Sequence, residues 1–151
     1  MDKFILVKHA QGAPGMRIFG LGPRFFPSNG LQQLQTLLNN NTFWAQDRSL
    51  KDLKVILSKS TLVVSLWTQD QLIGFGRATS DEIFRATLWD IVIDKRFQNL
   101  GLGERIVDSI LRHPLISKVE KIYLMTTFGS DFYLKMNFHK EKRQALMVLR
   151  K

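Results

Sequence analysis

Hydrophobic residues recur along this chain at two spacings, which divide it into helical and extended segments. Leucines 31, 34, 37 and 38 follow the 3.6-residue period of a helix, which Ser28 or Asn29 can cap and which ends in the Asn39 to Asn41 run. The same period predicts three further helices, at residues 49–59, 104–112 and 131–136, the last capped by Ser130 and the one before it ended by Pro114.

Alternating or continuous apolar runs rich in β-branched residues predict the strands. A polar turn, Thr68 to Gln71, separates the first two long runs, so an antiparallel meander is expected there. The first thirty residues are rich in glycine and proline and are predicted to form loops around one short strand. The predicted strands are 16–20, 62–67, 72–79, 86–93, 121–127 and 145–149. This order predicts an α+β domain with a mixed sheet.

The composition excludes several classes of function. The chain has no cysteine, which rules out disulfides, thiolate metal sites and cysteine nucleophiles, and its three histidines lack metal-ligand spacing. No apolar run approaches the ~20 residues of a membrane-spanning helix, and residues 1–10 lack the features of a secretory signal. We therefore expect a single domain over residues 1–151, cytoplasmic, with no metal and no membrane partner.

Positive charge is the one unusual feature of the composition. Lys and Arg outnumber Asp and Glu by 22 to 13, a formal net charge of +9, which favours an anionic ligand or partner. The basic residues are dispersed, however, and no Lys/Arg tract is interleaved with aromatic residues as in a nucleic-acid interface. A nucleic-acid partner is therefore not the first expectation.

One loop has the properties of an anion-binding site. Residues 98–103, Gln-Asn-Leu-Gly-Leu-Gly, lie between the strand 86–93 and the helix that begins at Glu104. The first amides of a helix lack intrahelical acceptors, so they can bind a pyrophosphate, and glycines let the backbone approach it closely. A Walker loop would need Gly-Lys-Ser/Thr, and a dinucleotide fingerprint would need glycine in place of Ile106. The glycines alone leave open a tight turn without a ligand.

The segment Gln98 to Gly103 resembles the Gln/Arg-x-x-Gly-x-Gly/Ala signature of the GNAT acetyltransferase superfamily. Residues 74–81, 88–94 and 97–103 are similar to plastid and cyanobacterial members related to serotonin N-acetyltransferases, and the likeness runs from about Leu62 to Phe138. The resemblance implies a mixed, mostly antiparallel central sheet flanked by helices, and an enzyme that moves an acetyl group from acetyl-CoA to an amine.

The resemblance also implies where acetyl-CoA binds. Its pyrophosphate is expected on the amides of the loop, and its pantetheine on the edge of the central strand, by the hydrogen bonding that adds a strand to a sheet. Lys95, Arg96 and Arg105 are candidates to approach the phosphates. The expected coenzyme-binding residues are Ile91, Val92, Ile93, Gln98, Asn99, Leu100, Gly101, Leu102 and Gly103.

A second segment, Phe132-Tyr-Leu-Lys-Met-Asn-Phe138, resembles the family's Phe-Tyr-x-x-x-Gly-Phe, in which the tyrosine hydroxyl faces the coenzyme sulfur. Asn137 replaces the glycine, and asparagine is the usual second choice for a left-handed helix cap. A tyrosine of pKa about 10 can protonate a departing thiolate whose thiol has a pKa near 8.5. Tyr133 is the candidate general acid; its alternative role is packing with Phe132 and Phe138.

The general base is harder to identify. Asp90 interrupts the apolar positions of the central strand, so it lies either at a bulge near the acetyl group or with its charge held by local amides. We take Asp90 as a candidate catalytic residue. Related enzymes carry another aspartate near the end of the next strand, where this chain has Thr126 and Thr127, so a chain of water molecules is the other candidate.

Three hypotheses follow. The leading one is an N-acetyltransferase whose acceptor is an arylalkylamine, a polyamine or a protein amine, with Trp67, Trp89 and Phe128 as a candidate aromatic wall. The others are a non-catalytic acyl-CoA sensor and a basic nucleic-acid-binding domain, whose affinity would fall steeply with salt. Monomer and homodimer are both open.

Overall fold

A five-stranded sheet in the order β1-β2-β3-β4-β5 organises the computed structural model, which describes residues 3–151. Neighbours from β1 to β4 are antiparallel, and β4 and β5 are parallel, which confirms the predicted mixed, mostly antiparallel sheet. The strands are β1 Ile5–Lys8, β2 Leu62–Thr68, β3 Gln71–Ser80, β4 Arg85–Ile93 and β5 Lys121–Tyr123.

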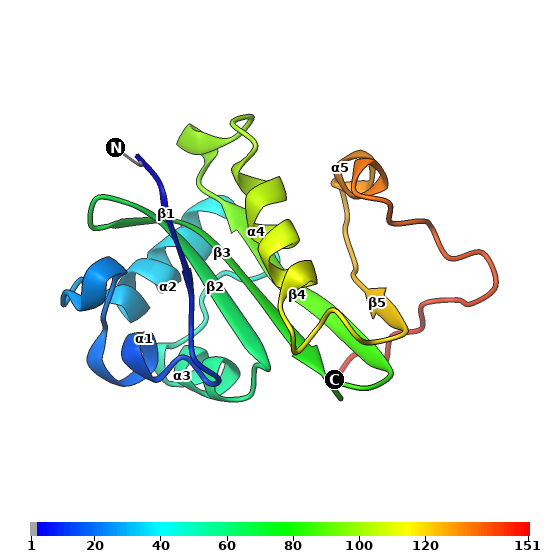
Figure 1. The fold of residues 1–151 in the computed structure, drawn as a ribbon, viewed down its shortest axis with the longest axis horizontal. Helices are drawn as coiled ribbons and strands as arrows, with labels where there is room; N and C mark the ends of the chain where they lie inside the picture. The colour runs from blue at the N-terminus through cyan, green and yellow to red at the C-terminus, as the bar shows by residue number, and fades with distance from the viewer. Residues whose placement is uncertain (1–2) are drawn as a thin grey trace.

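Helices cover both faces of this sheet (Figure 1). One buried cluster lies between α1, α2, α3 and one face, and a second lies between α4 and the other face. Two glycines of β3 make the second contact close, because a Cβ on Gly74 or Gly76 would stand 2.9 Å from side-chain atoms of Ile106. The helical elements are α1 Pro14–Phe19, η1 Pro23–Phe25, α2 Gly30–Asn41, α3 Leu50–Ser58, η2 Lys95–Phe97, α4 Leu102–Arg112 and α5 Ser130–Lys135.

Two of the predicted strands are wrong. Residues 16–20 lie in and just after helix α1, which starts with Pro14 and ends at Gly20 in the left-handed conformation. Helix α1 has six residues and only Met16 is buried. So short a helix shows no hydrophobic periodicity from which the sequence could predict it. Residues 145–149 form no strand, because they pair with no other segment, and Leu146 and Leu149 are exposed.

Smaller differences from the prediction concern β1, β5 and α5. Strand β1 was not predicted, since four residues ending in exposed Lys8 give too little alternation. Strand β5 is shorter than expected, and α5 begins after Gly129 without the predicted side-chain cap from Ser130. Within residues 3–151 no helix is long and apolar enough to cross a bilayer.

A buried polar cluster ties β1 to the sheet interior. His9 follows β1, and its Nε2 lies 2.7 Å from the hydroxyl of Ser65, which also accepts a hydrogen bond from Trp67 Nε1 at 2.8 Å. Burial lowers the pKa of His9 from 6.5 to about 4. The imidazole is therefore neutral at pH 7, and its Nε2 shares one hydrogen bond with the Ser65 hydroxyl.

This shifted pKa predicts a pH dependence of stability. The unfolded chain binds a proton at residue 9 below pH 6.5 and the folded chain only below about 4, so the free energy of unfolding falls between these values. The full loss is about 3 kcal/mol at 1.36 kcal/mol per pKa unit. Denaturant melts at pH 7, 5.5 and 4.5 should show a steeper loss for wild type than for His9→Gln. Parallel pH profiles for the two proteins would contradict the prediction.

Candidate active site

A β-bulge in β4 is the central feature of the site. Phe75 pairs with Val92 and Arg77 with Trp89, so two residues of β4, Asp90 and Ile91, oppose the single residue between them on β3. Asp90 has a φ of 55°, in the left-handed region. The bulge shifts the alternation of the strand, because Leu88 packs on the α4 side and Val92 on the opposite side.

Beyond this bulge β4 has an open edge. Strand β5 pairs with β4 only from Arg85 to Thr87, and within residues 3–151 no strand pairs with β4 on that side from Leu88 onward. Figure 1 shows β5 and α5 lying apart from this end of β4. The predicted pantetheine-binding residues Ile91, Val92 and Ile93 lie along the open edge, where the backbone groups that do not pair with β3 could meet a ligand with amide groups.

The loop 98–103 adjoins the same end of β4. The side-chain amide of Gln98 donates to the carbonyl of Ile93 at 3.2 Å, which joins loop and strand edge. Asn99 and Gly101 have φ values of 62° and 76°, and Gly101 is the N-cap of α4, which has no side-chain cap. A Cβ on Gly101 would meet no atom within 4 Å, so there is open space beside the residue that precedes α4. The anion site at this loop stays a prediction.

The second glycine of the motif lies next to helix α5. A Cβ on Gly103 would lie 3.4 Å from the ring of Phe132 and 3.8 Å from Ile93. These are ordinary van der Waals distances, so α5 packs beside the start of α4 without needing a glycine at position 103. This contact brings Tyr133, the next residue on α5, to the neighbourhood of the loop.

The three basic residues expected near the phosphates differ in their surroundings. Arg96 pairs with Asp94 at 2.7 Å and lies over the ring of Phe97, and its side-chain hydrogen bond lowers the pKa of Asp94. Arg105 donates to the carbonyl of Phe4 at 3.3 Å. No ion pair involves Lys95 within the described part of the chain.

Tyr133 lies between two aromatic rings and a cavity. Its ring packs edge-on against Phe132 and Phe138, at centroid distances of 4.9 and 5.7 Å. It also lines a cavity of about 630 Å³ between β4, β5, α5 and the chain after α5, to which Trp89 and Leu124 also contribute. Burial raises the pKa of Tyr133 to about 12. Tyr133 therefore packs as a core residue does and still reaches a cavity.

The predicted left-handed cap after α5 is confirmed. Asn137 has a φ of 68°, and the next residue, Phe138, returns its amide to the carbonyl of Tyr133 at 3.0 Å. Asparagine thus closes α5 in the way a glycine would.

Asp90 is held by two arginines rather than by amides. Its Oδ2 accepts from Arg77 Nε at 2.7 Å, and its Oδ1 lies 3.1 Å from Arg48 Nη1, while only 4% of the Asp90 side chain is exposed. Sequence reasoning missed both arginines. Arg77 could have been found from the sequence. It is the one charge in an apolar strand, and the neighbouring strand carries one opposite charge, Asp90, which indicates that the two pair. Arg48 lies in a loop and had none.

The predicted aromatic wall is only partly present. Trp67 is fully buried in the core on the α1–α3 side, so it cannot line a site. Phe128 is exposed and meets Phe43 at 6.1 Å, and Phe43 meets Trp44 at 5.4 Å. These three rings, here called the aromatic cluster, join the loop between α2 and α3 to the loop before α5.

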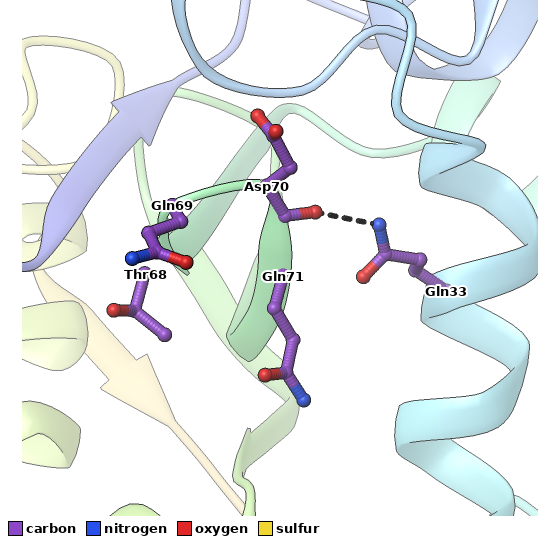
Figure 2. A pocket seen from close by; sticks show the side chains of 5 residues that line it. All are labelled: Gln33, Thr68, Gln69, Asp70 and Gln71. Atoms are coloured by element: carbon purple, nitrogen blue, oxygen red, sulfur yellow. Dashed lines mark hydrogen bonds between the residues drawn. The ribbon is translucent and has the colours of Figure 1, made fainter.

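A separate hollow lies at the β2–β3 turn and is lined by Gln33, Thr68, Gln69, Asp70 and Gln71 (Figure 2). Gln33 donates to the carbonyl of Asp70 at 2.8 Å and accepts from the amide of Leu72 at 2.8 Å. These bonds attach α2 to the hairpin. The hollow holds none of the predicted site residues, and we assign it a structural role.

Comparison with known proteins gives a consistent result. The sequence profile of the acetyltransferase (GNAT) family matches residues 31–138. The chain is 38% identical over 104 residues to the uncharacterized N-acetyltransferase ycf52 of Porphyra purpurea, covering 62% of this chain and 57% of that protein. It is 33% identical to the ycf52 protein of Gracilaria tenuistipitata var. liui, covering 91% and 76%. The chain thus spans little more than half the length of some relatives.

Solved structures share the fold. A GNAT family acetyltransferase from Streptococcus pneumoniae superposes with a TM-score of 0.69 at 15% identity, covering 98% of this chain and 99% of that one. Glucosamine-6-phosphate N-acetyltransferase from Arabidopsis thaliana gives a TM-score of 0.62 at 14% identity, covering 99% and 100%. At these identities the likeness concerns the α+β fold alone.

The open space at Gly101 leads to a prediction about acetyl-CoA binding. A valine there would fill the space that a phosphate would enter, so Gly101→Val should weaken binding at least ~10-fold, measured by calorimetry. Gly101→Asn should also weaken it while tolerating the left-handed backbone, which separates blocking from strain. Gly15→Ala, whose Cβ meets only Leu21 at 3.8 Å, is the control. Full affinity in a folded Gly101→Asn protein would place the phosphates elsewhere.

Proposed function

We propose, from the premise that this chain belongs to the acetyltransferase (GNAT) family, that it transfers an acetyl group from acetyl-CoA to an amine. The observation that carries this proposal is the open edge of β4 beside the uncapped start of α4. Together they offer strand-like hydrogen bonds and free helix amides to one ligand with an amide-containing arm and a pyrophosphate. Acetyl-CoA has both parts.

In this proposal the chain binds the coenzyme mainly through its backbone. The amides of residues 99–103 hold the pyrophosphate, and Ile91 to Ile93 pair with the amides of the pantetheine. The φ values of Asn99 and Gly101 shape the loop for this purpose. Main-chain recognition of this kind needs little basic side-chain charge, which agrees with the engagement of Arg96 by Asp94.

We assign the general acid role to Tyr133. The amine nitrogen, once deprotonated by water, forms a bond to the acetyl carbon, the carbon–sulfur bond breaks, and the Tyr133 hydroxyl donates its proton to the departing sulfur. The proton that the nitrogen loses on becoming an amide returns through water to the Tyr133 oxygen. With a pKa raised to about 12, the hydroxyl keeps its proton throughout the neutral range. The same burial would raise the pKa of a thiol in this surrounding, which offsets the weaker acidity of the tyrosine.

Among the candidate acceptors, the aromatic cluster favours an arylalkylamine. Phe43, Trp44 and Phe128 are 60%, 51% and 87% exposed, and exposed rings that meet in one place are available to stack against an aromatic body. The net charge of +9 works against polyamines, whose several positive charges it repels.

The test is transfer of label from radiolabelled acetyl-CoA to a panel of 2-phenylethylamine, spermidine and a lysine peptide. We expect acetylation, fastest with 2-phenylethylamine. Tyr133→Phe should lower turnover by roughly 10² to 10⁴ at pH 7 with little change in coenzyme affinity. The deficit should shrink as the pH becomes alkaline, where a thiolate is tolerated without a proton donor.

Two results would contradict these assignments. Coenzyme binding without transfer to any amine would favour an acyl-CoA sensor over an enzyme. Wild-type turnover by Tyr133→Phe across the whole pH range would make Tyr133 a packing residue only. Phe132→Leu, which changes a neighbouring ring without touching the hydroxyl, is the packing control.

A further inference from the structure

We propose that Asp90 is a positioning residue, which through Arg48 holds segment 42–49 against the bulge of β4 and so sets the place of the aromatic cluster. This inference rests on the proposed acetyl transfer for its kinetic consequences only. The tether itself is a property of the fold and is measurable without activity.

The charge arrangement around Asp90 supports positioning over proton transfer. Each carboxylate oxygen faces a guanidinium, Oδ2 that of Arg77 and Oδ1 that of Arg48, and the arginine side chains are 13% and 30% exposed. This small buried cluster already carries one net positive charge. If Asp90 were the base, it would accept a proton from an ammonium group, and this proton would add a further positive charge to the cluster. Removing one partner instead leaves a buried charge uncompensated.

The two arginines come from different parts of the fold. Arg77 belongs to β3, next to the bulge, whereas Arg48 belongs to the connection between α2 and α3. The backbone of Arg48 is held at α2, because its carbonyl accepts from Gln35 Nε2 at 2.9 Å. Its side chain then reaches β4. Asp90 is therefore the point at which segment 42–49 meets the bulged strand.

The same segment carries two rings of the aromatic cluster. Thr42 and Ala45 of this segment are buried, and the Thr42 hydroxyl donates to the carbonyl of Leu38 at 2.8 Å. Phe43 and Trp44 project from it and are exposed, and Phe43 meets Phe128 from the loop before α5. A shift of segment 42–49 would therefore move two rings relative to the third.

Arg48 gives the cleaner variant for a test. Its Nη1 forms the ion pair but has no hydrogen bond of good geometry, so its removal leaves the stronger Arg77–Asp90 bond in place. Arg48→Met keeps an apolar stem and deletes the charge. Arg85→Met is the control. It removes an exposed ion pair of 2.8 Å with Glu120 at the first residue of β4, five residues before Asp90.

Hydrogen exchange of the amides of segment 42–49 is measured in wild type, Arg48→Met, Arg48→Lys and Arg85→Met. Loss of the tether should raise exchange in this segment ~10-fold or more in Arg48→Met, less in Arg48→Lys, and not in Arg85→Met. With 2-phenylethylamine as acceptor, Arg48→Met should raise the acceptor KM about tenfold and change kcat and the acetyl-CoA KM less than about twofold.

Unchanged exchange in segment 42–49 overturns the proposal, whatever the kinetics show. Asp90→Asn supplies the second criterion. A fall of about 10² in kcat at saturating acceptor for Asp90→Asn, with kcat of Arg48→Met unchanged, would identify Asp90 as the base and overturn the proposal as well. If no amine is acetylated, the proposed function fails while hydrogen exchange still decides whether the tether exists.

Discussion

The bulge at Asp90 is the constraint on which the rest of the site depends. One extra residue in β4 bends the strand and interrupts its ladder with β3, and from Leu88 onward β4 has no partner on the β5 side within residues 3–151. An open strand edge inside a sheet leaves backbone groups without partners. In this account a ligand with amide groups meets that need, so the defect in the sheet creates the site.

The bulge places the carboxylate of Asp90 in the protein interior, where its negative charge must be neutralised. Asp90 is nearly inaccessible, and an isolated carboxylate there would cost several kcal/mol. Arg77 and Arg48 offset this cost, and because one comes from β3 and the other from the α2–α3 connection, neutralising the charge also connects two layers of the fold. The need to neutralise Asp90 thus links the open edge, the bulged strand and the aromatic cluster.

The parts of this arrangement that were predictable from sequence share a local cause. Helices α2, α3 and α4 and strands β2 to β4 follow from long periodic runs, and Asn137 from the conformation that a helix end demands. The partners of Asp90 and the ring neighbours of Phe128 depend on contacts between distant segments, which periodicity does not encode. The strand predicted at 145–149 is absent for the same reason, because apolar residues form a strand only where the edge of a neighbouring strand pairs with them.

The central claim is that the open edge of β4 and the start of α4 bind one ligand together. Hydrogen exchange measured with saturating CoA, ATP and NAD tests it most directly. The account predicts that CoA protects amides both at residues 91–93 and at residues 99–104, whereas ATP, which has phosphates but no pantetheine arm, protects at most the second set. Protection by CoA confined to residues 99–104, or equal protection by all three ligands, would contradict it.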